Sequence, residues 1–239
     1  MQRYYRRMQS HRVLLDPISL MCILTAFFVF GINMTTLIPL KEDPIINDVF
    51  LKNIVAFGIL IGCLTMMLVT GIYNPKTDQD YFIDAKELNT IIIWVIIDLF
   101  VILMIEIITF TYSPLSTIAE LGIISVSGFS VLMGWSEEVL RAVILIYGSR
   151  IADETSALFV STFIWTIYHG GVYGLDFKPM LIIFGSGIIL GASILANNGR
   201  ISVSMLPHGI NNLLAHVSGQ SIFKIGGQNV LRILLSMVK

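Results

Sequence analysis

The sequence predicts an all-α, polytopic membrane protein built as one helical bundle, and three observations support this. Hydrophobic residues make up 55% of the 239 residues, and only 13% are charged. A soluble domain of this size would carry about a quarter charged residues. The mean hydropathy is +0.82, and several apolar runs approach the ~20 residues that a helix needs to cross a bilayer.

The apolar runs divide the chain into about eight predicted transmembrane helices, spaced as expected for a bilayer of ordinary thickness. The predicted spans are 18–38, 53–73, 89–110, 129–149, 156–174, 179–197, 201–217 and 221–238. The stretch 111–128 is too interrupted by Pro, Gly and polar residues to be a span of its own. We expect it to be a re-entrant or interfacial helix, and the alternative joins it to the next segment as one long broken helix.

Small residues four apart occur in two of these spans, at Gly58 and Gly62 and at Gly187 and Gly191. Such pairs let membrane helices approach closely, so we expect them to pack inside the bundle. Cys22 and Cys63 also fall within spans, where we expect buried thiols and no disulfide.

The basic residues predict a multi-pass protein of the cell membrane with a cytoplasmic N-terminus. Arg3, Arg6, Arg7 and Arg12 precede the first span, and cytoplasmic segments of membrane proteins are enriched in Lys and Arg. The 74–88 loop, Arg150 and Arg200 then fall on the same side. We expect a single membrane domain over 1–239, with a cytoplasmic basic segment at 1–17 and a motif-bearing core at 90–217. Nothing in the sequence indicates nucleic-acid binding.

Three polar motifs interrupt the apolar helices. They are Glu137-Glu138-Val139-Leu140-Arg141, Trp165-Thr166-Ile167-Tyr168-His169 and His208-Gly209-Ile210-Asn211-Asn212. A charged side chain at the bilayer centre costs about 2.5–3.5 kcal/mol on insertion scales, so such residues are functional candidates. All three motifs fall within roughly one helical turn of the same depth, which indicates a shared site.

These groups suggest hydrolysis by an activated water molecule. A carboxylate and an imidazole can take a proton from water, and a second imidazole with an amide can donate hydrogen bonds to a developing oxyanion. A zinc site made by Glu and two His is the main chemical rival. We expect no metal or cofactor, because Arg141 beside the carboxylates disfavours a cation.

The order of the motifs resembles the CPBP (Abi) family of CAAX-protease and bacteriocin-processing-type intramembrane glutamic proteases. His208 and Asn212 match that family's third motif, and His169 matches the second, with Trp165 in place of a Phe. The resemblance implies a CPBP-like fold, a catalytic Glu with His169 to activate water, and an oxyanion site at His208 and Asn212.

The first motif departs from the family pattern, because only two residues separate the Glu pair from Arg141 where the family has three. If Arg141 sets the register, Ser136 stands where the family has its first Glu. Alternatively Glu137 or Glu138 takes that role, with a local adjustment such as a π-bulge. Glu137 and Arg141 share a helix face and are also candidates for a structural ion pair.

The hypothesis from sequence is therefore a metal-independent intramembrane endopeptidase that acts on a peptide or protein tail at membrane depth. The substrate would be prenylated or resemble a bacteriocin leader peptide. The alternative is an inactive CPBP-fold protein that serves as an immunity factor or as an accessory subunit of a membrane complex, and Ser136 favours it. A transporter is a third idea, which the lack of an inverted repeat disfavours.

Overall fold

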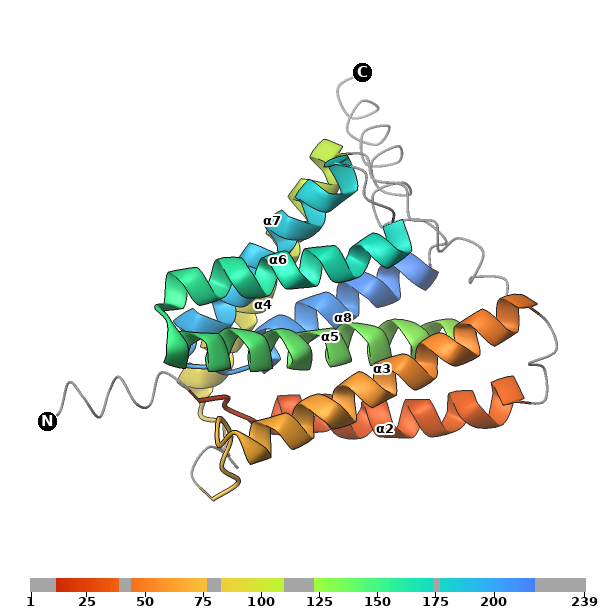
Figure 1. The fold of residues 1–239 in the computed structure, drawn as a ribbon, viewed down its shortest axis with the longest axis horizontal. Coiled ribbons are helices and arrows are strands. Elements are labelled where there is room, and N and C mark those ends of the chain that lie inside the picture. Colours follow the sequence, from red (N-terminus) through yellow and green to blue (C-terminus); the bar gives the residue numbers. More distant parts are fainter. Residues whose placement is uncertain (1–11, 39–43, 77–82, 110–122, 174–176, 218–239) are drawn as a thin grey trace, which may run out of the picture.

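The computed structural model describes residues 12–38, 44–76, 83–109, 123–173 and 177–217, and the regular structure in these ranges is helical (Figure 1). One isolated bridge, between Leu14 and Arg200, accompanies the helices. The helices are α2 (Pro17–Leu37), α3 (Pro44–Val69), α4 (Ala85–Thr109), α5 (Ile123–Ile151), α6 (Glu154–Tyr173), α7 (Phe177–Ala196) and α8 (Ser202–Val217). The predicted all-α fold is confirmed.

Helix α5 lies at the centre of the bundle. It packs against α2 and α3 on one side and against α6 and α8 on another, while α4 and α7 pack beyond them (Figure 1). The apolar core forms mainly where α5 meets α2 and α3, around fully buried side chains such as Leu60, Met67, Leu145 and Ile146. Every polar group on the inner face of α5 is therefore surrounded by other helices.

Three stretches within the described residues are long and apolar enough to cross a membrane, by length and composition. They are Pro17–Thr35, Phe50–Val69 and Pro179–Ala196. Many large apolar side chains on these helices point outward, for example Phe28 at 69% exposure and Val69 at 80%. An apolar outer surface is what a bilayer requires.

The helix boundaries correct the predicted spans in two places. Helix α3 begins at Pro44, nine residues before the predicted start, and ends at Val69 instead of residue 73. The first two turns of α3 contain polar residues, so hydropathy alone does not identify them as part of the helix. The helix ends shortly before Gly71, whose φ of +64° lies in the left-handed region. The predicted eighth span, 221–238, lies outside the described residues.

The interrupted stretch 111–128 is also corrected in part. Residues 123–128 form the first turns of α5, so the expectation of a separate interfacial helix is wrong for them. Residues 110–122 lie outside the described part of the chain. The remaining predicted spans agree with α2, α4, α6, α7 and α8 to within about four residues, a normal uncertainty for boundaries.

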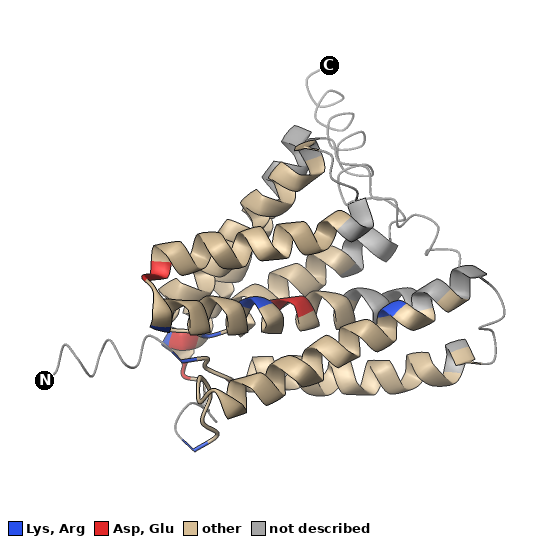
Figure 2. Ribbon diagram, in the orientation of Figure 1, with Lys and Arg blue, Asp and Glu red and all other residues tan. Residues whose placement is uncertain are grey.

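Charged residues gather at two places in the described chain, at the middle of α5 and at one end of the bundle (Figure 2). At this end the backbone of Val13 and Leu14 hydrogen-bonds to Ile72 and Gly199, and Arg150 donates to the carbonyls of Thr70 and Gly71. The N-terminal segment, the α3–α4 connection, Arg150 and Arg200 are therefore neighbours, as the predicted topology requires.

The residues just before α2 are part of the packed fold. Val13 and Leu15 are buried, and Asp16 caps α2 by accepting a hydrogen bond from the Ser19 amide at 2.8 Å. The sequence-based picture of 1–17 as a basic cytoplasmic segment therefore misses the structural role of its last residues. Residues 1–11 are not described.

Candidate active site

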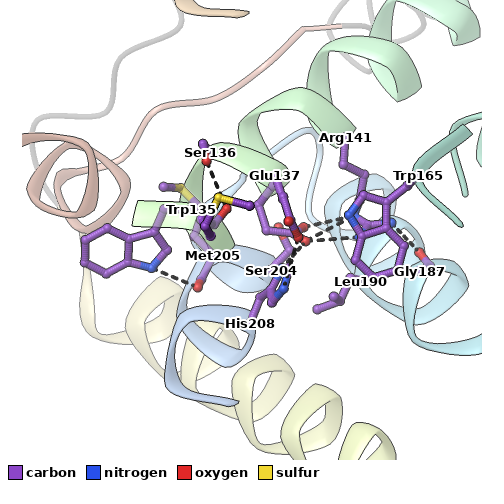
Figure 3. Close-up of polar contacts among 12 residues, drawn as sticks. Trp135, Ser136, Glu137, Arg141, Trp165, Gly187, Leu190, Ser204, Met205 and His208 are labelled. Atoms are coloured by element: carbon purple, nitrogen blue, oxygen red, sulfur yellow. Dashed lines mark hydrogen bonds and ion pairs between the residues drawn. The ribbon is translucent and has the colours of Figure 1, made fainter. Parts of the chain in front are cut away.

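The three polar motifs meet between α5, α6 and α8 (Figure 3). Glu137, from the middle of α5, places its Oε2 atom 3.3 Å from His169 Nε2 of α6 and 3.5 Å from His208 Nε2 of α8. The three side chains are buried, with exposures between 4% and 8% for the whole residues. The structure thus brings together the groups that the sequence placed at a common depth.

Glu138 points to a different set of partners from its neighbour. Its carboxylate accepts hydrogen bonds from Arg141 Nε at 3.0 Å and Nη2 at 3.1 Å, which makes the pair bidentate. It also accepts one from His208 Nδ1 at 2.7 Å. Glu138 and Arg141 are completely buried or nearly so, and a buried pair needs such additional hydrogen bonds to offset the loss of hydration.

Arg141 is held on its remaining sides by α7 and α6. Its Nη1 donates to the Gly187 carbonyl at 3.1 Å, and its Cζ lies 4.0 Å from the ring centre of Trp165. A side chain at position 187 would displace this arrangement, because a Cβ there would lie 3.0 Å from Arg141 Nη1 and 2.9 Å from Thr162 Cγ2. Gly187 therefore lets α7 bring a carbonyl to the buried guanidinium.

The partners of the two histidines define how their rings are protonated. His169 Nδ1 lies 2.8 Å from the Trp165 carbonyl, which can only accept, so Nδ1 carries the hydrogen. His208 Nδ1 faces a carboxylate in the same way. In both rings Nε2 is then the nitrogen that faces Glu137 and can exchange a proton there.

Trp165 packs against both histidines of the site. Its ring centre lies 4.2 Å from that of His169 and 5.9 Å, edge to face, from that of His208. The Arg141 guanidinium also lies 4.0 Å from the centre of the Trp165 ring, so this ring contacts both the buried ion pair and the His169 imidazole.

Asn212 lies one turn after His208 on α8 and is half-buried. Its Nδ2 would be 3.0 Å from a Cβ built on Gly134, which precedes Glu137 by one turn on α5. The amide is thus turned toward the same face of α5 as the two glutamates. All five residues expected at the catalytic centre therefore come from facing sides of α5, α6 and α8.

Two alternatives considered for the first motif are not what the structure shows. Arg141 pairs with Glu138 and not with Glu137. Residues three and four apart are both neighbours on a helix, and contacts from other helices hold this pair, from His208 to Glu138 and from Arg141 to the Gly187 carbonyl. The suggested π-bulge is also absent, since α5 is α-helical throughout Ile123–Ile151.

The Ser136 hydroxyl is hydrogen-bonded to its own helix. Its Oγ donates to the carbonyls of Leu132 at 2.7 Å and Met133 at 2.9 Å on its own helix. Ser136 is therefore not the residue that contacts the imidazoles. Glu137 contacts both of them, and Glu138 binds Arg141 and His208.

Several contributors to this site were missed by sequence reasoning. Trp135 Nε1 donates to the Met205 carbonyl at 3.1 Å and thereby ties α5 to α8 beside the site. The roles of Gly134, Gly187 and Gly209 were also not found. The spacing of Gly187 and Gly191 indicated a close helix contact, which is confirmed, but only the structure shows that Gly187 contributes its carbonyl.

Among the described residues, no group of three or more His, Cys, Asp and Glu side chains is arranged to hold a metal ion. Both histidines use Nδ1 for hydrogen bonds to the protein. What the arrangement offers is one carboxylate oxygen with two imidazole nitrogens, groups that can accept and pass on a proton.

Comparison with known proteins identifies the family of this chain. The family described as type II CAAX prenyl endopeptidase Rce1-like matches residues 87–214, which coincides with the stretch 90–217 on which the CPBP resemblance rests. Neither a comparison with curated proteins nor one with solved structures found a match. The family match covers more than half of the chain, and together with the apolar helices it shows a membrane protein that belongs to the type II CAAX prenyl endopeptidase Rce1-like family.

Proposed function

We propose that this protein hydrolyses a peptide bond of a membrane-embedded or lipidated peptide, with water activated by Glu137 and His169. The observation that carries the proposal is the position of Glu137 Oε2, 3.3 Å from His169 Nε2 and 3.5 Å from His208 Nε2. A carboxylate oxygen and an imidazole nitrogen this close together can both contact one water molecule that lies beside them, and can share its proton.

The assignment of Glu137 as the base rests on what its neighbour does. Glu138 is occupied by Arg141 and by His208 Nδ1, so its lone pairs are committed to holding other residues. Glu137 Oε2 receives no well-aligned hydrogen bond from a described residue. Glu138 would therefore act as a positioning residue that orients His208, as a carboxylate commonly orients a catalytic imidazole.

The proposed reaction proceeds through a tetrahedral intermediate. The water oxygen attacks the carbonyl carbon while its proton passes to the Glu137–His169 pair. Asn212 donates a hydrogen bond to the oxygen that becomes negative, and His208 does so through Nε2 when its ring carries both protons. The C–N bond then breaks, the stored proton moves to the leaving nitrogen, and the products are an amine and a carboxylic acid, which releases its own proton on leaving the site.

The substrate class follows from the family and from the depth of the site. Glu137 stands at the midpoint of the 29-residue α5, so the scissile bond must reach the interior of the bundle. A CAAX-type tail carrying a prenyl group can do so, because the chain partitions into lipid while the peptide follows it. A hydrophobic leader peptide is the other candidate, and the cytoplasmic orientation of the N-terminus stays part of the proposal.

The alternative of an inactive family member rested on Ser136 standing for a missing glutamate. The hydrogen bonds of Ser136 to its own helix and the position of Glu137 argue for the active alternative. An immunity factor or accessory subunit would not require two imidazoles directed at one carboxylate oxygen.

Peptide cleavage by the purified protein in lipid vesicles, read by mass spectrometry, would test the proposal. The substrates would be one CAAX-type peptide with and without its prenyl group, and a leader-type peptide of equal length. Cleavage of the prenylated peptide that is lost in His169→Ala and His208→Ala would support the proposal. Wild-type protein that folds but cleaves none of the peptides would overturn it in favour of a binding role.

Two further measurements separate the chemical rivals. EDTA and 1,10-phenanthroline should leave cleavage unchanged, and a loss restored by zinc would indicate a metal enzyme. Ser136→Glu should not raise activity, because its side chain would enter the packed face that now holds Ser136 against Leu132. A gain would instead place the base at position 136.

A further inference from the structure

Gly134 lies on the face of α5 that carries the two glutamates. Positions 134, 137, 138 and 141 follow at spacings of three and four residues, so they line up along one side of the helix. Gly134 is buried, and a Cβ built on it would lie 3.0 Å from Asn212 Nδ2. The absence of a side chain at this position therefore leaves the space that the amide needs.

The facing turn of α8 carries the reciprocal feature. A Cβ on Gly209 would lie 2.4 Å from Trp135 Nε1, and this same indole nitrogen donates to the Met205 carbonyl at 3.1 Å. Two adjacent residues of α5, Gly134 and Trp135, thus interlock with the turn of α8 that contains His208. Each glycine makes room for a side chain of the other helix.

Another glycine of α5 shows what ordinary close packing looks like on this helix. A Cβ on Gly148 would lie 3.2 Å from Ala157 Cβ of α6, a contact between two apolar carbons. The crowding is similar to that at Gly134. The difference is the neighbour, which at Gly134 is the polar end of a site residue.

We propose that Gly134 is a positioning residue that fixes the Asn212 amide beside Glu137 and His208. This inference rests on the proposed function, in which Asn212 donates a hydrogen bond to the oxyanion. A methyl group at position 134 would meet Nδ2 first and move the amide, while the Gly209 backbone stands at 3.4–3.5 Å. A contact of 3.0 Å would force Nδ2 to move by a few tenths of an ångström, and a misplacement of about 1 Å can lower a rate about 100-fold, so a smaller loss of rate is expected here.

The test compares Gly134→Ala, Gly148→Ala, Asn212→Ala and the double variant Gly134→Ala/Asn212→Ala in lipid vesicles. We expect Gly134→Ala to lower kcat by about 3- to 10-fold with KM little changed, as for an oxyanion donor displaced by a fraction of an ångström. Gly148→Ala should change kcat less than about threefold, since its neighbour is remote from the site. The double variant should match Asn212→Ala alone, because two residues that act through one group are not additive.

Three outcomes would overturn the proposal. First, the fold losses in kcat of Gly134→Ala and Asn212→Ala could multiply in the double variant, which would mean that Gly134 does not act through Asn212. Second, Gly148→Ala could lower kcat as much as Gly134→Ala, which would mean that both substitutions act only by disturbing helix packing. Third, Gly134→Ala could fail to fold. The double variant should then fold because the clashing amide is gone; if it also fails, the side chain at position 134 clashes with the Gly209 backbone instead of with Asn212.

A second readout keeps this inference separate from the proposed reaction. The side-chain amide signal of Asn212, labelled with ¹⁵N and observed by NMR in detergent micelles, should shift in Gly134→Ala and stay unchanged in Gly148→Ala. If the wild-type protein cleaves no peptide, the proposed function fails, but this shift still decides whether Gly134 positions Asn212. An unchanged signal in both variants would overturn the positioning role even in an active enzyme.

Discussion

Two buried charge clusters in this protein use the same kinds of residues for different ends. The site cluster consists of Glu137, Glu138, Arg141, His169 and His208. The end cluster consists of Asp16, Ser19, Glu87, Arg200 and Ser202. Both tie several helices together, and Figure 2 shows one at the middle of α5 and the other at one end of the bundle.

The end cluster is saturated with hydrogen bonds. Asp16 accepts from the Ser19 amide at one oxygen, and from Arg200 Nη1 at 3.0 Å and the Ser202 hydroxyl at the other. Arg200 Nη2 also reaches Glu87 at 3.2 Å. Both oxygens of this buried carboxylate are engaged by protein donors, so this cluster is a structural tie between α2, α4 and the α7–α8 connection.

The site cluster differs at one atom. Glu138 is as fully engaged as Asp16, but Glu137 Oε2 makes only the two longer contacts with imidazole nitrogens. Buried polar atoms in native proteins are rarely left in this state without a reason. Within these two clusters, the comparison teaches that Asp16 and Glu138 hold the fold, whereas Glu137 Oε2, which faces two imidazoles, is the oxygen placed for chemistry.

Glu137→Gln should have the largest effect and should act on activity alone. Loss of a general base lowers rates about 10²- to 10⁴-fold, and the isosteric amide removes no well-aligned hydrogen bond, so thermal unfolding should be unchanged. Cleavage kinetics and unfolding in detergent would be measured together. If Glu138→Gln lowers kcat more while retaining stability, the two glutamates have exchanged roles.

Arg141→Met should instead act on stability. It leaves Glu138 without its bidentate partner inside the bundle, and breaking a buried pair in this way costs about 3–5 kcal/mol of unfolding free energy. The double variant with Glu138→Gln should recover part of that loss, because the uncompensated charge is gone. A single variant as stable as the wild type would contradict the structural role given to this pair.

Asp16→Asn should weaken the end cluster without touching the chemistry. Hydrogen bonds to charged groups contribute about 1.5–3 kcal/mol each, and Arg200 keeps its contact with Glu87. We expect a lower unfolding temperature and a kcat within about threefold of the wild type. Glu87→Gln, at a half-exposed partner, serves as the milder control. A selective loss of kcat would mean that the end cluster also positions α8.

Asp153→Asn should have the smallest effect, because this residue is exposed and belongs to neither cluster. Hydrogen bonds from the Ser156 hydroxyl and amide hold the pKa of the Asp153 carboxyl below its ordinary value. A carboxyl with a lowered folded pKa stabilises the protein above its unfolded pKa of about 3.9 and loses that contribution as the pH falls through the folded pKa. The difference in unfolding temperature from the wild type should be present near about pH 6 and shrink on acidification; a difference that grows in acid would contradict this assignment.

The sequence predicted much of the candidate site because its polar residues are unusual in their surroundings. Glu137, Glu138, His169 and His208 stand out among apolar helices, and helical spacing places them at one depth. The pairing inside the first motif could not be read in this way. Residues three and four apart are both neighbours on a helix, so Glu137 and Glu138 were equal candidates for Arg141 until the packing of α7 and α8 was known.

The sequence by itself determined the helical membrane architecture, the depth of the motifs and the family, because these depend on composition and on periodicity along single helices. Only the tertiary structure decided that Glu138 holds Arg141 and His208 while Glu137 faces both Nε2 atoms. It also decided the roles of Gly134 and Gly187, since a glycine reveals its purpose only through the atoms of other helices that fill the space beside it. Contacts between helices depend on rotation and register, which no periodicity within one helix records.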